Sequence, residues 1–234
     1  MTVALSRRSP QTLHRIIKDA ARAVKIARKE DPTALQKISD SGDGDPFRVL
    51  ISTVLSHRTK DPTTAAASSR LFTAFPNALS LSTANVRTVA RLIRPVGFYR
   101  KKAKTVKRLA KIILDEYQGV VPGEVEELLK LPSVGRKTAN CVLVFGFKKP
   151  AIPVDTHVHR IFNRLGVVET KTPEETEMEL VRIVDRRDWL DLNDVFVKFG
   201  QLVCRPIGPK CSACPLNDRC RYYREYYPKK VHAS

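Results

Sequence analysis

The side chains with chemical potential in this sequence form a lysine–aspartate pair and a group of cysteines. Lys137 lies in the segment LPSVGRKTANC, and Asp155 follows eighteen residues later in PVDTHV. An uncharged lysine amine is a nucleophile, and a carboxylate can stabilise developing positive charge or transfer a proton. Four cysteines share seventeen residues near the end of the chain: Cys204, Cys211, Cys214 and Cys220. Thiolates at these spacings can hold Zn²⁺ or a [4Fe–4S] cluster, and spacing alone does not separate the two.

The glycine, lysine and threonine around Lys137 have the order found at the end of a phosphate-binding P-loop. That motif needs another glycine five residues before this one, and it follows a buried strand. Here Lys130 occupies the position five before Gly135, and Arg136 separates Gly135 from Lys137. The preceding residues, GEVEELLK, have the pattern of a short amphipathic helix. The P-loop interpretation therefore fails on both counts.

A helix–hairpin–helix is the alternative. Its first helix spans Glu124 to Lys130, residues 133–135 turn the chain, and the second helix runs from Arg136 through Phe145. A glycine in such a turn lets backbone N–H groups approach a phosphate, and a helix N-terminus adds positive potential. The unit either binds a DNA backbone without reading its sequence or is an ordinary pair of packed helices.

The pattern elsewhere is also helical, and we predict an all-α protein of roughly ten helices without strands. Asp45-Pro46 and Asp61-Pro62 are helix starts, each with aspartate as N-cap and proline in the first turn. Thr172 and Glu175 have the spacing of a capping box. The acidic, Gly-containing stretch 39–46 is a candidate linker. The helix after it carries an apolar stripe: Phe47, Leu50, Ile51, Val54 and Leu55.

Positive charge is the strongest bulk property. The chain has 234 residues, with 42 Lys and Arg against 24 Asp and Glu and a formal net charge of +18. An excess of this size favours a polyanionic partner, and its spread along the whole chain favours nucleic acid over a membrane surface. Seven basic residues lie between Arg100 and Lys111, on a predicted helix with a basic face. Its other face carries an inward stripe: Val106, Leu109, Ala110 and Ile113.

No apolar run approaches the ~20 residues that span a bilayer, so we expect no membrane association. The first ten residues, MTVALSRRSP, lack the long apolar segment of a signal peptide. The expected location is cytoplasmic and nucleoid-associated if the protein is prokaryotic or archaeal, and nuclear if it is eukaryotic. Thiols stay reduced in these compartments, which favours a metal site over disulfides for the cysteine group.

Four segments, in the same order along the chain, resemble the endonuclease III family of DNA glycosylases. LPSVGRKTAN followed by VDTHVHR is similar to its helix–hairpin–helix and catalytic segment. DPFRVLISTVLSHRTKD and VGFYRKKA are similar to its DNA-facing segments, and CRPIGPKCSACPLNDRC has its Cys-x6-Cys-x2-Cys-x5-Cys iron–sulfur pattern. The likeness extends from about Asp45 to about Tyr223.

The resemblance implies a fold and a domain organisation. We expect the two-domain, all-α helix–hairpin–helix DNA glycosylase fold. A six-helix barrel domain that includes the hairpin would span 39–149, and 1–38 with 150–234 would form the cluster-bearing domain.

The resemblance also implies residue roles. Lys137 would attack the anomeric carbon of the sugar, and Asp155 would be the catalytic carboxylate as well as the N-cap of the helix that follows it. Related adenine glycosylases lack a lysine at this site, so Lys137 indicates a bifunctional glycosylase that also acts as an AP lyase. The four cysteines would hold a structural [4Fe–4S] cluster.

By the same resemblance, DNA contacts are expected from Arg58, Phe98, Val134, Gly135, Arg136 and Thr138. Arg58 stands where the bacterial enzymes usually have the glutamine that fills the gap left by the flipped base, and His57 stands where they usually have alanine. Phe98 occupies the position of an apolar wedge; the alternative is a core aromatic. These departures leave the range of lesions open.

The expected function is excision of oxidised pyrimidines from double-stranded DNA by a monomer, with a Schiff base and β-elimination on the 3′ side of the lesion. The partner would be duplex DNA with a damaged base or an abasic site. Two alternatives stay open: a mismatch glycosylase for thymine or uracil opposite guanine, and a non-catalytic DNA-binding iron–sulfur protein. The presence of both Lys137 and Asp155 speaks against the second.

Overall fold

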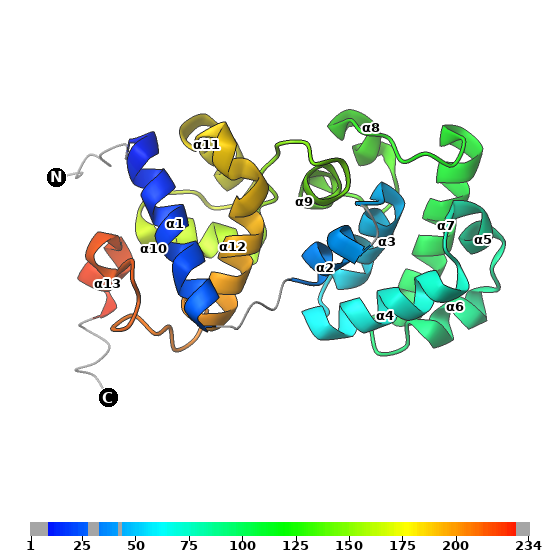
Figure 1. The fold of residues 1–234 in the computed structure, drawn as a ribbon, viewed down its shortest axis with the longest axis horizontal. Coiled ribbons are helices and arrows are strands. Elements are labelled where there is room, and N and C mark those ends of the chain that lie inside the picture. Colours follow the sequence, from blue (N-terminus) through cyan, green and yellow to red (C-terminus); the bar gives the residue numbers. More distant parts are fainter. Residues whose placement is uncertain (1–8, 28–32, 42–43, 228–234) are drawn as a thin grey trace. The chain divides into compact units, whose positions relative to one another are not determined.

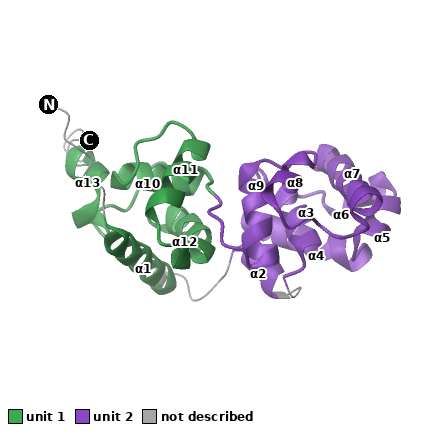
Figure 2. Ribbon diagram, turned by 90° about the horizontal axis from the view of Figure 1, so that it is seen from above, with its two compact units in different colours: residues 1–31, 154–234 green, residues 32–153 purple. Residues whose placement is uncertain are grey.

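The chain forms two compact helical units (Figures 1 and 2). The structure is a computed structural model that describes residues 9–27, 33–41 and 44–227. Residues 32–153 form unit 2, and the two ends of the chain, 1–31 and 154–234, come together in unit 1. The described residues contain helices and no β-strand, which confirms the predicted all-α class.

The unit boundaries differ from the expected domain boundaries by a few residues. The units divide at 31/32 and 153/154, where the sequence suggested 38/39 and 149/150. Helix α2 (Ala34–Ser41) accounts for the first difference, because it packs on α3 and α4 of unit 2. The stretch 39–46 therefore begins as helix rather than linker. Its residues 42–43 lie outside the described residues, as does the segment 1–8 inspected for a signal peptide.

Unit 2 continues with a series of helices that ends in the predicted hairpin (Figure 1). These are α3 (Pro46–Ser56), α4 (Asp61–Ala74), α5 (Ala78–Thr83), α6 (Val86–Leu92), α7 (Tyr99–Tyr117), α8 (Val125–Lys130), α9 (Arg136–Cys141) and the π-helix η1 (Val142–Gly146). The second helix of the hairpin, predicted to run through Phe145, is thus α9 with a π-helical continuation.

Helix α3 lies at the centre of unit 2. It packs against α2, α4, α7, α9 and η1. All five residues of the predicted apolar stripe are buried, and so are Val49, Ser52 and Thr53 on its other faces. A helix buried all round is an interior element rather than an amphipathic surface helix. The close approach of η1 to the start of α3 requires Gly146, because a Cβ there would lie 2.9 Å from the Cα of Pro46.

The predicted helix starts are largely confirmed. Asp45 caps α3, with its side chain accepting a hydrogen bond from the Phe47 N–H at 2.9 Å. The predicted cap of α4 is wrong by one residue: Lys60 is the N-cap and Asp61 lies in the first turn. A carboxylate in the first turn still interacts favourably with the helix dipole.

The predicted capping box of α11 (Pro173–Ile183) is half formed. Thr172 Oγ1 accepts from the Glu175 N–H at 3.2 Å, as the box requires. The Glu175 carboxylate accepts from the Lys171 N–H at 2.7 Å instead of from the cap residue itself. The glutamate therefore braces the chain one residue before the helix cap.

Unit 1 is built around α12 (Trp189–Leu202). Helix α1 (Pro10–Ala27) and α10 (Thr156–Leu165) pack on it. Phe162 of α10 packs against Phe196 with tilted rings whose centroids are 4.7 Å apart, and Phe196 contacts Phe199 edge-on at 6.2 Å. The remaining elements of unit 1 are α11, the short 3₁₀-helices η2 (Arg186–Asp188) and η3 (Asn217–Arg219), and α13 (Arg221–Glu225).

The longest described helix is α7, with 19 residues. The predicted inward stripe of this basic segment is confirmed, because Val106, Leu109, Ala110 and Ile113 are fully buried. Within the described ranges, no helix combines the length and the apolar character needed to cross a membrane.

Candidate functional site

The predicted hairpin is present in unit 2. Helices α8 and α9 are joined by residues 131–135, and the Val134 N–H donates to the Leu131 carbonyl at 3.2 Å to close the turn. The left-handed residue of the turn is Ser133, with φ 64°, whereas Gly135 has φ −101°. Any L-residue can adopt the backbone of Gly135, so conformation does not explain the glycine.

The fold needs no glycine at position 135 for packing either. A Cβ built there would meet no atom within 4 Å, and Gly135 caps α9 without a side-chain hydrogen bond. An open approach to a helix start is what the predicted phosphate contact requires. Arg136 is exposed, but Val134 and Thr138 are only 7% and 3% exposed. A phosphate contact by these last two residues would have to come from the backbone.

The two predicted DNA-facing loops of unit 2 lie against each other. A Cβ on Gly97 would come within 2.9 Å of the carbonyl oxygen of Arg58. The Gly97 N–H also donates to Thr59 Oγ1 at 3.3 Å. The structure therefore brings together the loops that carry Arg58 and Phe98, forty residues apart in the sequence.

Arg58 and Phe98 share an unusual backbone conformation. Both are left-handed, with φ 52° and φ 57°, a conformation that costs a non-glycine residue roughly 1–3 kcal/mol. Both side chains are exposed, Phe98 to 65%. Phe98 is therefore not a core aromatic, and its role as a wedge stays a prediction.

Lys102 holds the loop that carries Arg58. The sequence did not reveal this role. Lys102 is 8% exposed, and its ammonium donates to the carbonyls of Leu55 at 2.8 Å and His57 at 2.5 Å and to Thr59 Oγ1 at 3.2 Å. Burial lowers the pKa of Lys102 to about 8. A signal was available, because Lys102 precedes Val106 by four residues and so continues the inward stripe of α7.

His57 links this loop to the hairpin. Its Nε2 lies 3.1 Å from the hydroxyl oxygen of Thr138 in α9. Burial, and then the positive charges of Lys137 and Lys102, lower the pKa of His57 to about 4. The imidazole is therefore uncharged at neutral pH. The sequence marked His57 only as a departure from the family and did not reveal this contact.

Lys137 belongs to unit 2 and Asp155 to unit 1. Lys137 is half-buried in the first turn of α9, close enough to His57 to affect its charge. Asp155 caps α10, with Oδ1 accepting from the N–H groups of His157 and Val158, both at 2.9 Å. The predicted cap is confirmed, and the catalytic roles of both residues stay predictions.

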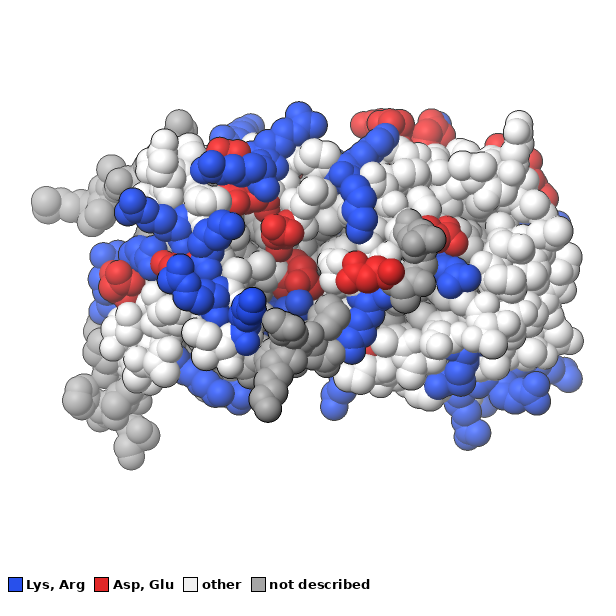
Figure 3. Space-filling model, viewed as in Figure 1, with Lys and Arg blue, Asp and Glu red and all other residues white. Residues whose placement is uncertain are grey.

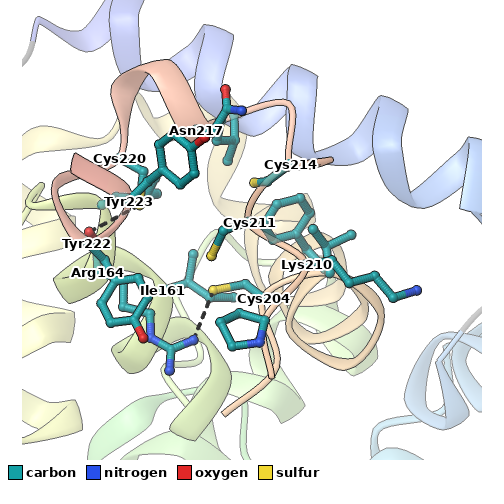
Figure 4. A pocket seen from close by; sticks show the side chains of 15 residues that line it. Ile161, Arg164, Cys204, Lys210, Cys211, Cys214, Asn217, Cys220, Tyr222 and Tyr223 are labelled. Atoms are coloured by element: carbon teal, nitrogen blue, oxygen red, sulfur yellow. Dashed lines mark hydrogen bonds between the residues drawn. The ribbon is translucent and has the colours of Figure 1, made fainter. Parts of the chain in front are cut away.

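The four cysteines line one pocket of unit 1 (Figure 4). Among the described residues, no Asp, Glu or His side chain lines it. The ammonium of Lys210 points away from the sulfurs in Figure 4. The donor set is therefore sulfur, which suits zinc or an iron–sulfur cluster rather than calcium or magnesium. The described residues hold no group of three or more His, Cys, Asp or Glu side chains already at metal-binding geometry.

The electrostatics of this pocket favour a positively charged occupant. Burial raises the pKa of the Cys211 and Cys214 thiols to about 11, and the neighbouring cysteines add to both shifts. Arg164 Nη1 donates to Cys204 Sγ at 3.4 Å, and the same guanidinium lies 4.7 Å from the ring centroid of Tyr222. Four thiolates would repel one another here without a cation, so the residues fit a metal ion or an iron–sulfur centre.

Basic side chains are unevenly distributed over the surface. On the face drawn in Figure 3, Lys and Arg gather over unit 1, with a few carboxylates among them. Over unit 2 the middle of the same face is largely uncharged, with Lys and Arg along its lower edge and carboxylates along its upper edge. Each unit thus has its own charge pattern on this face.

Comparisons with known proteins relate the chain to DNA repair enzymes. Residues 51–186 match the HhH-GPD superfamily base excision DNA repair protein. The chain is 51% identical over 180 residues to endonuclease III of Thermotoga maritima, covering 77% of this chain and 84% of the relative. It is 44% identical over 186 residues to the chloroplastic endonuclease III homolog 2 of Arabidopsis thaliana, covering 74% of this chain and 47% of the relative. The match thus spans about half of the Arabidopsis protein.

A solved structure shows the same architecture. The structure of a trapped endonuclease III–DNA covalent intermediate superposes with a TM-score of 0.80 at 30% identity, over 96% of this chain and 99% of that chain. This similarity includes both units.

Replacing His57 with Gln should remove a pH-dependent loss of stability. The unfolded chain protonates His57 near its ordinary pKa of 6.5, but the folded protein does so only near 4. Between these values the unfolded state binds more protons, so the contribution of His57 makes the free energy of unfolding fall as the pH falls. Urea unfolding of both proteins at a series of pH values from about 7 down to about 4 measures the difference. The His57→Gln variant should gain stability relative to the parent as the pH falls, and a pH-independent difference would contradict this.

Proposed function

The chain belongs to the endonuclease III family, within the HhH-GPD superfamily of base excision DNA repair proteins, and we propose that it excises oxidised pyrimidines with Lys137 as nucleophile. It is a DNA glycosylase that binds DNA, and AP lyase activity is typical of its family. The observation that carries the proposal is the half-buried Lys137 in the first turn of α9, beside the uncharged imidazole of His57.

The surroundings of Lys137 favour a reactive amine. A lysine with an ordinary pKa of about 10.4 is almost wholly charged at neutral pH and is then no nucleophile. Partial burial and the helix N-terminus both disfavour the ammonium. Lys137 and Lys102 both lie close enough to His57 to lower its pKa, and the imidazole is uncharged at neutral pH. These contacts support the role of Lys137 as nucleophile.

The proposed reaction starts with the damaged nucleotide rotated out of the duplex. The Nζ lone pair of Lys137 bonds to C1′ while the bond from C1′ to the base breaks, and the base leaves with those electrons and takes up a proton. The attached nitrogen gives up a proton, its freed lone pair forms the C1′=N bond while the bond from C1′ to O4′ breaks, O4′ takes up a proton, and a protonated Schiff base results. Loss of a C2′ proton expels the 3′ phosphate, and hydrolysis of the Schiff base releases Lys137.

Asp155 would supply the negative charge that these reaction steps need. A carboxylate stabilises positive charge that develops on the sugar and can accept a proton from the attacking amine. Its oxygen Oδ1 is fixed by two backbone N–H groups of α10. The cap thus restricts the orientation of the carboxyl group before any substrate binds.

The loops of unit 2 would keep the duplex open. Phe98 is exposed at the N-cap of α7 and could support unstacking, and Arg58 would fill the gap left by the flipped base. Gly135 and Arg136 would bind the backbone phosphates without reading sequence. The partner is double-stranded DNA with a damaged base or an abasic site, bound by a monomer in the nucleoid or the nucleus.

A mismatch glycosylase is the second candidate, and Arg58 is the observation that favours it. Arginine carries a fixed charge and a planar set of donors, so it can contact the unpaired base differently from glutamine. The orphan base would then affect activity more strongly than the lesion. Duplexes with thymine or uracil opposite guanine test this candidate against thymine glycol.

We further propose that Cys204, Cys211, Cys214 and Cys220 hold a [4Fe–4S] cluster. The four sulfurs that line their pocket and the repulsion between buried thiolates support it. When bound, such a cluster supplies a cationic iron centre that links the four thiolates. The proposed glycosylase reaction uses no step at this site.

Replacing Lys137 with Ala should abolish covalent trapping. Borohydride reduces the Schiff base, so the parent should form an irreversible adduct with duplexes that contain an abasic site or thymine glycol. The rate for Lys137→Ala should fall about 10³-fold or more, because no other amine occupies its place. Lys111→Ala, which removes an exposed lysine of α7 in the same unit but outside the predicted DNA-facing segment 96–103, is the matched control. An undiminished adduct in Lys137→Ala would refute the assignment.

Two substitutions at Asp155 should separate the cap from the chemistry. Asparagine keeps an acceptor oxygen for the two N–H groups, so Asp155→Asn should unfold like the parent, while Asp155→Ala should lose about 1 kcal/mol. Both should lower the trapping rate about 10²- to 10⁴-fold, because both lack the charge. Urea unfolding and single-turnover trapping give the two quantities. Full activity in Asp155→Asn would remove the carboxylate from the mechanism.

The cluster proposal predicts a coloured protein. Protein purified without oxygen should contain about four iron atoms and four sulfides per chain and absorb visible light. Cys214→Ala should lose the colour and the iron. Cys141→Ala should keep them, because Cys141 is buried in unit 2 and does not line the pocket. A colourless parent with one zinc ion would replace the cluster with a zinc site of four thiolates.

A further inference from the structure

We propose that His57 is a positioning residue for Lys137, acting through its contact with Thr138, and that it couples the loop of Arg58 to the nucleophile. This inference rests on the proposed function. It goes further because it assigns a role to a residue outside the catalytic pair and outside the predicted DNA contacts.

The backbone of His57 is fixed from one side. Its carbonyl accepts from Lys102 at 2.5 Å and from the Thr59 hydroxyl at 3.3 Å. Lys102 also holds the carbonyl of Leu55 at 2.8 Å, at the end of α3. The residue from which the imidazole projects therefore has little freedom to move.

The side chain of His57 is fixed from the other side. Its Nε2 lies 3.1 Å from Thr138 Oγ1, and Thr138 is 3% exposed in the first turn of α9. Lys137 directly precedes Thr138 in that turn. A shift of the loop at His57 would thus be passed to the turn that carries the nucleophile, through one hydrogen bond.

The charge state of the imidazole suits this position. Lys137 from α9 and Lys102 from α7 are the charged groups that act on it, and both disfavour the imidazolium. A neutral ring beside Lys137 occupies space next to the amine and adds no positive charge of its own. Replacing it with a small side chain admits water, and water stabilises the ammonium form of the lysine.

The same arrangement connects the nucleophile to the residue proposed to contact the orphan base. Arg58 follows His57 directly and has a left-handed backbone, with an exposed side chain. If Arg58 contacts the orphan base, a movement of Arg58 is transmitted through the backbone to its neighbour His57. The contact between His57 and Thr138 then links the loop that carries Arg58 directly to α9.

Single-turnover borohydride trapping on an abasic-site duplex, with enzyme in excess and over a range of pH, tests the inference. His57→Ala should lower the rate constant about 10-fold and move the midpoint of the pH profile upward by about half a unit to one unit. His57→Gln, which is neutral and can reach the Thr138 hydroxyl, should recover most of the rate. Affinity for a duplex with a tetrahydrofuran abasic analogue should change by less than about threefold.

Thr138→Val tests the route independently, because it removes the hydroxyl with little change in size. If the effect passes through this hydrogen bond, adding Thr138→Val to His57→Ala should cost little more than His57→Ala alone. Thermal melting of all variants identifies any that fail to fold, and the Gln and Val variants then carry the test. An unchanged pH midpoint in the folded variants, fully additive losses, or a rate loss matched by an equal loss of affinity would each overturn the proposal.

The controls distinguish this inference from the proposed function. A parent protein that forms no adduct, or an adduct that survives in Lys137→Ala, defeats the lyase assignment itself. A parent that traps through Lys137 while His57→Ala behaves like the parent defeats only the role of His57.

Discussion

A buried ammonium group organises the loop surface of unit 2. Lys102 satisfies carbonyl oxygens at the end of α3, where a helix leaves its last carbonyls without intrahelical partners and its dipole favours a cation. A buried charge without such acceptors would be costly, so the lysine and the loop stabilise each other. The position of His57, the left-handed turn at Arg58 and the contact with Gly97 all follow from where this loop leaves α3.

Local signals in the sequence predicted much of this arrangement. Asp45 and Thr172 cap their helices because capping depends on residues within one turn. The hairpin was predictable for the same reason. The burial of Lys102 was missed although its place continues the inward stripe of α7, because its charge suggested a surface position and its acceptors, the Leu55 and His57 carbonyls, lie some forty-five residues away. The boundary at α2 likewise depends on long-range packing that no local pattern encodes.

The candidate site likewise combines residues that the sequence predicted with contacts that it did not. The types and spacing of Lys137, Asp155 and the cysteines were readable from the chain, because chemistry restricts the residue types. The contact between His57 and Thr138, eighty-one residues apart, was not. In unit 1, long-range contacts also support the cysteine segment: Arg219, next to Cys220, pairs with Asp19 of α1 at 2.6 Å. The first helix of the chain therefore braces a segment near its end.

The contact between Gly97 and Arg58 has a consequence for how this protein can diverge. A side chain at position 97 would meet the backbone of the other loop at 2.9 Å, and backbone cannot rotate aside as a side chain does. A residue other than glycine at position 97 should therefore occur only together with a change in the length or path of the 57–60 loop. Homologues that have altered one loop are expected to have altered the other, so the two loops form a single unit of evolutionary change.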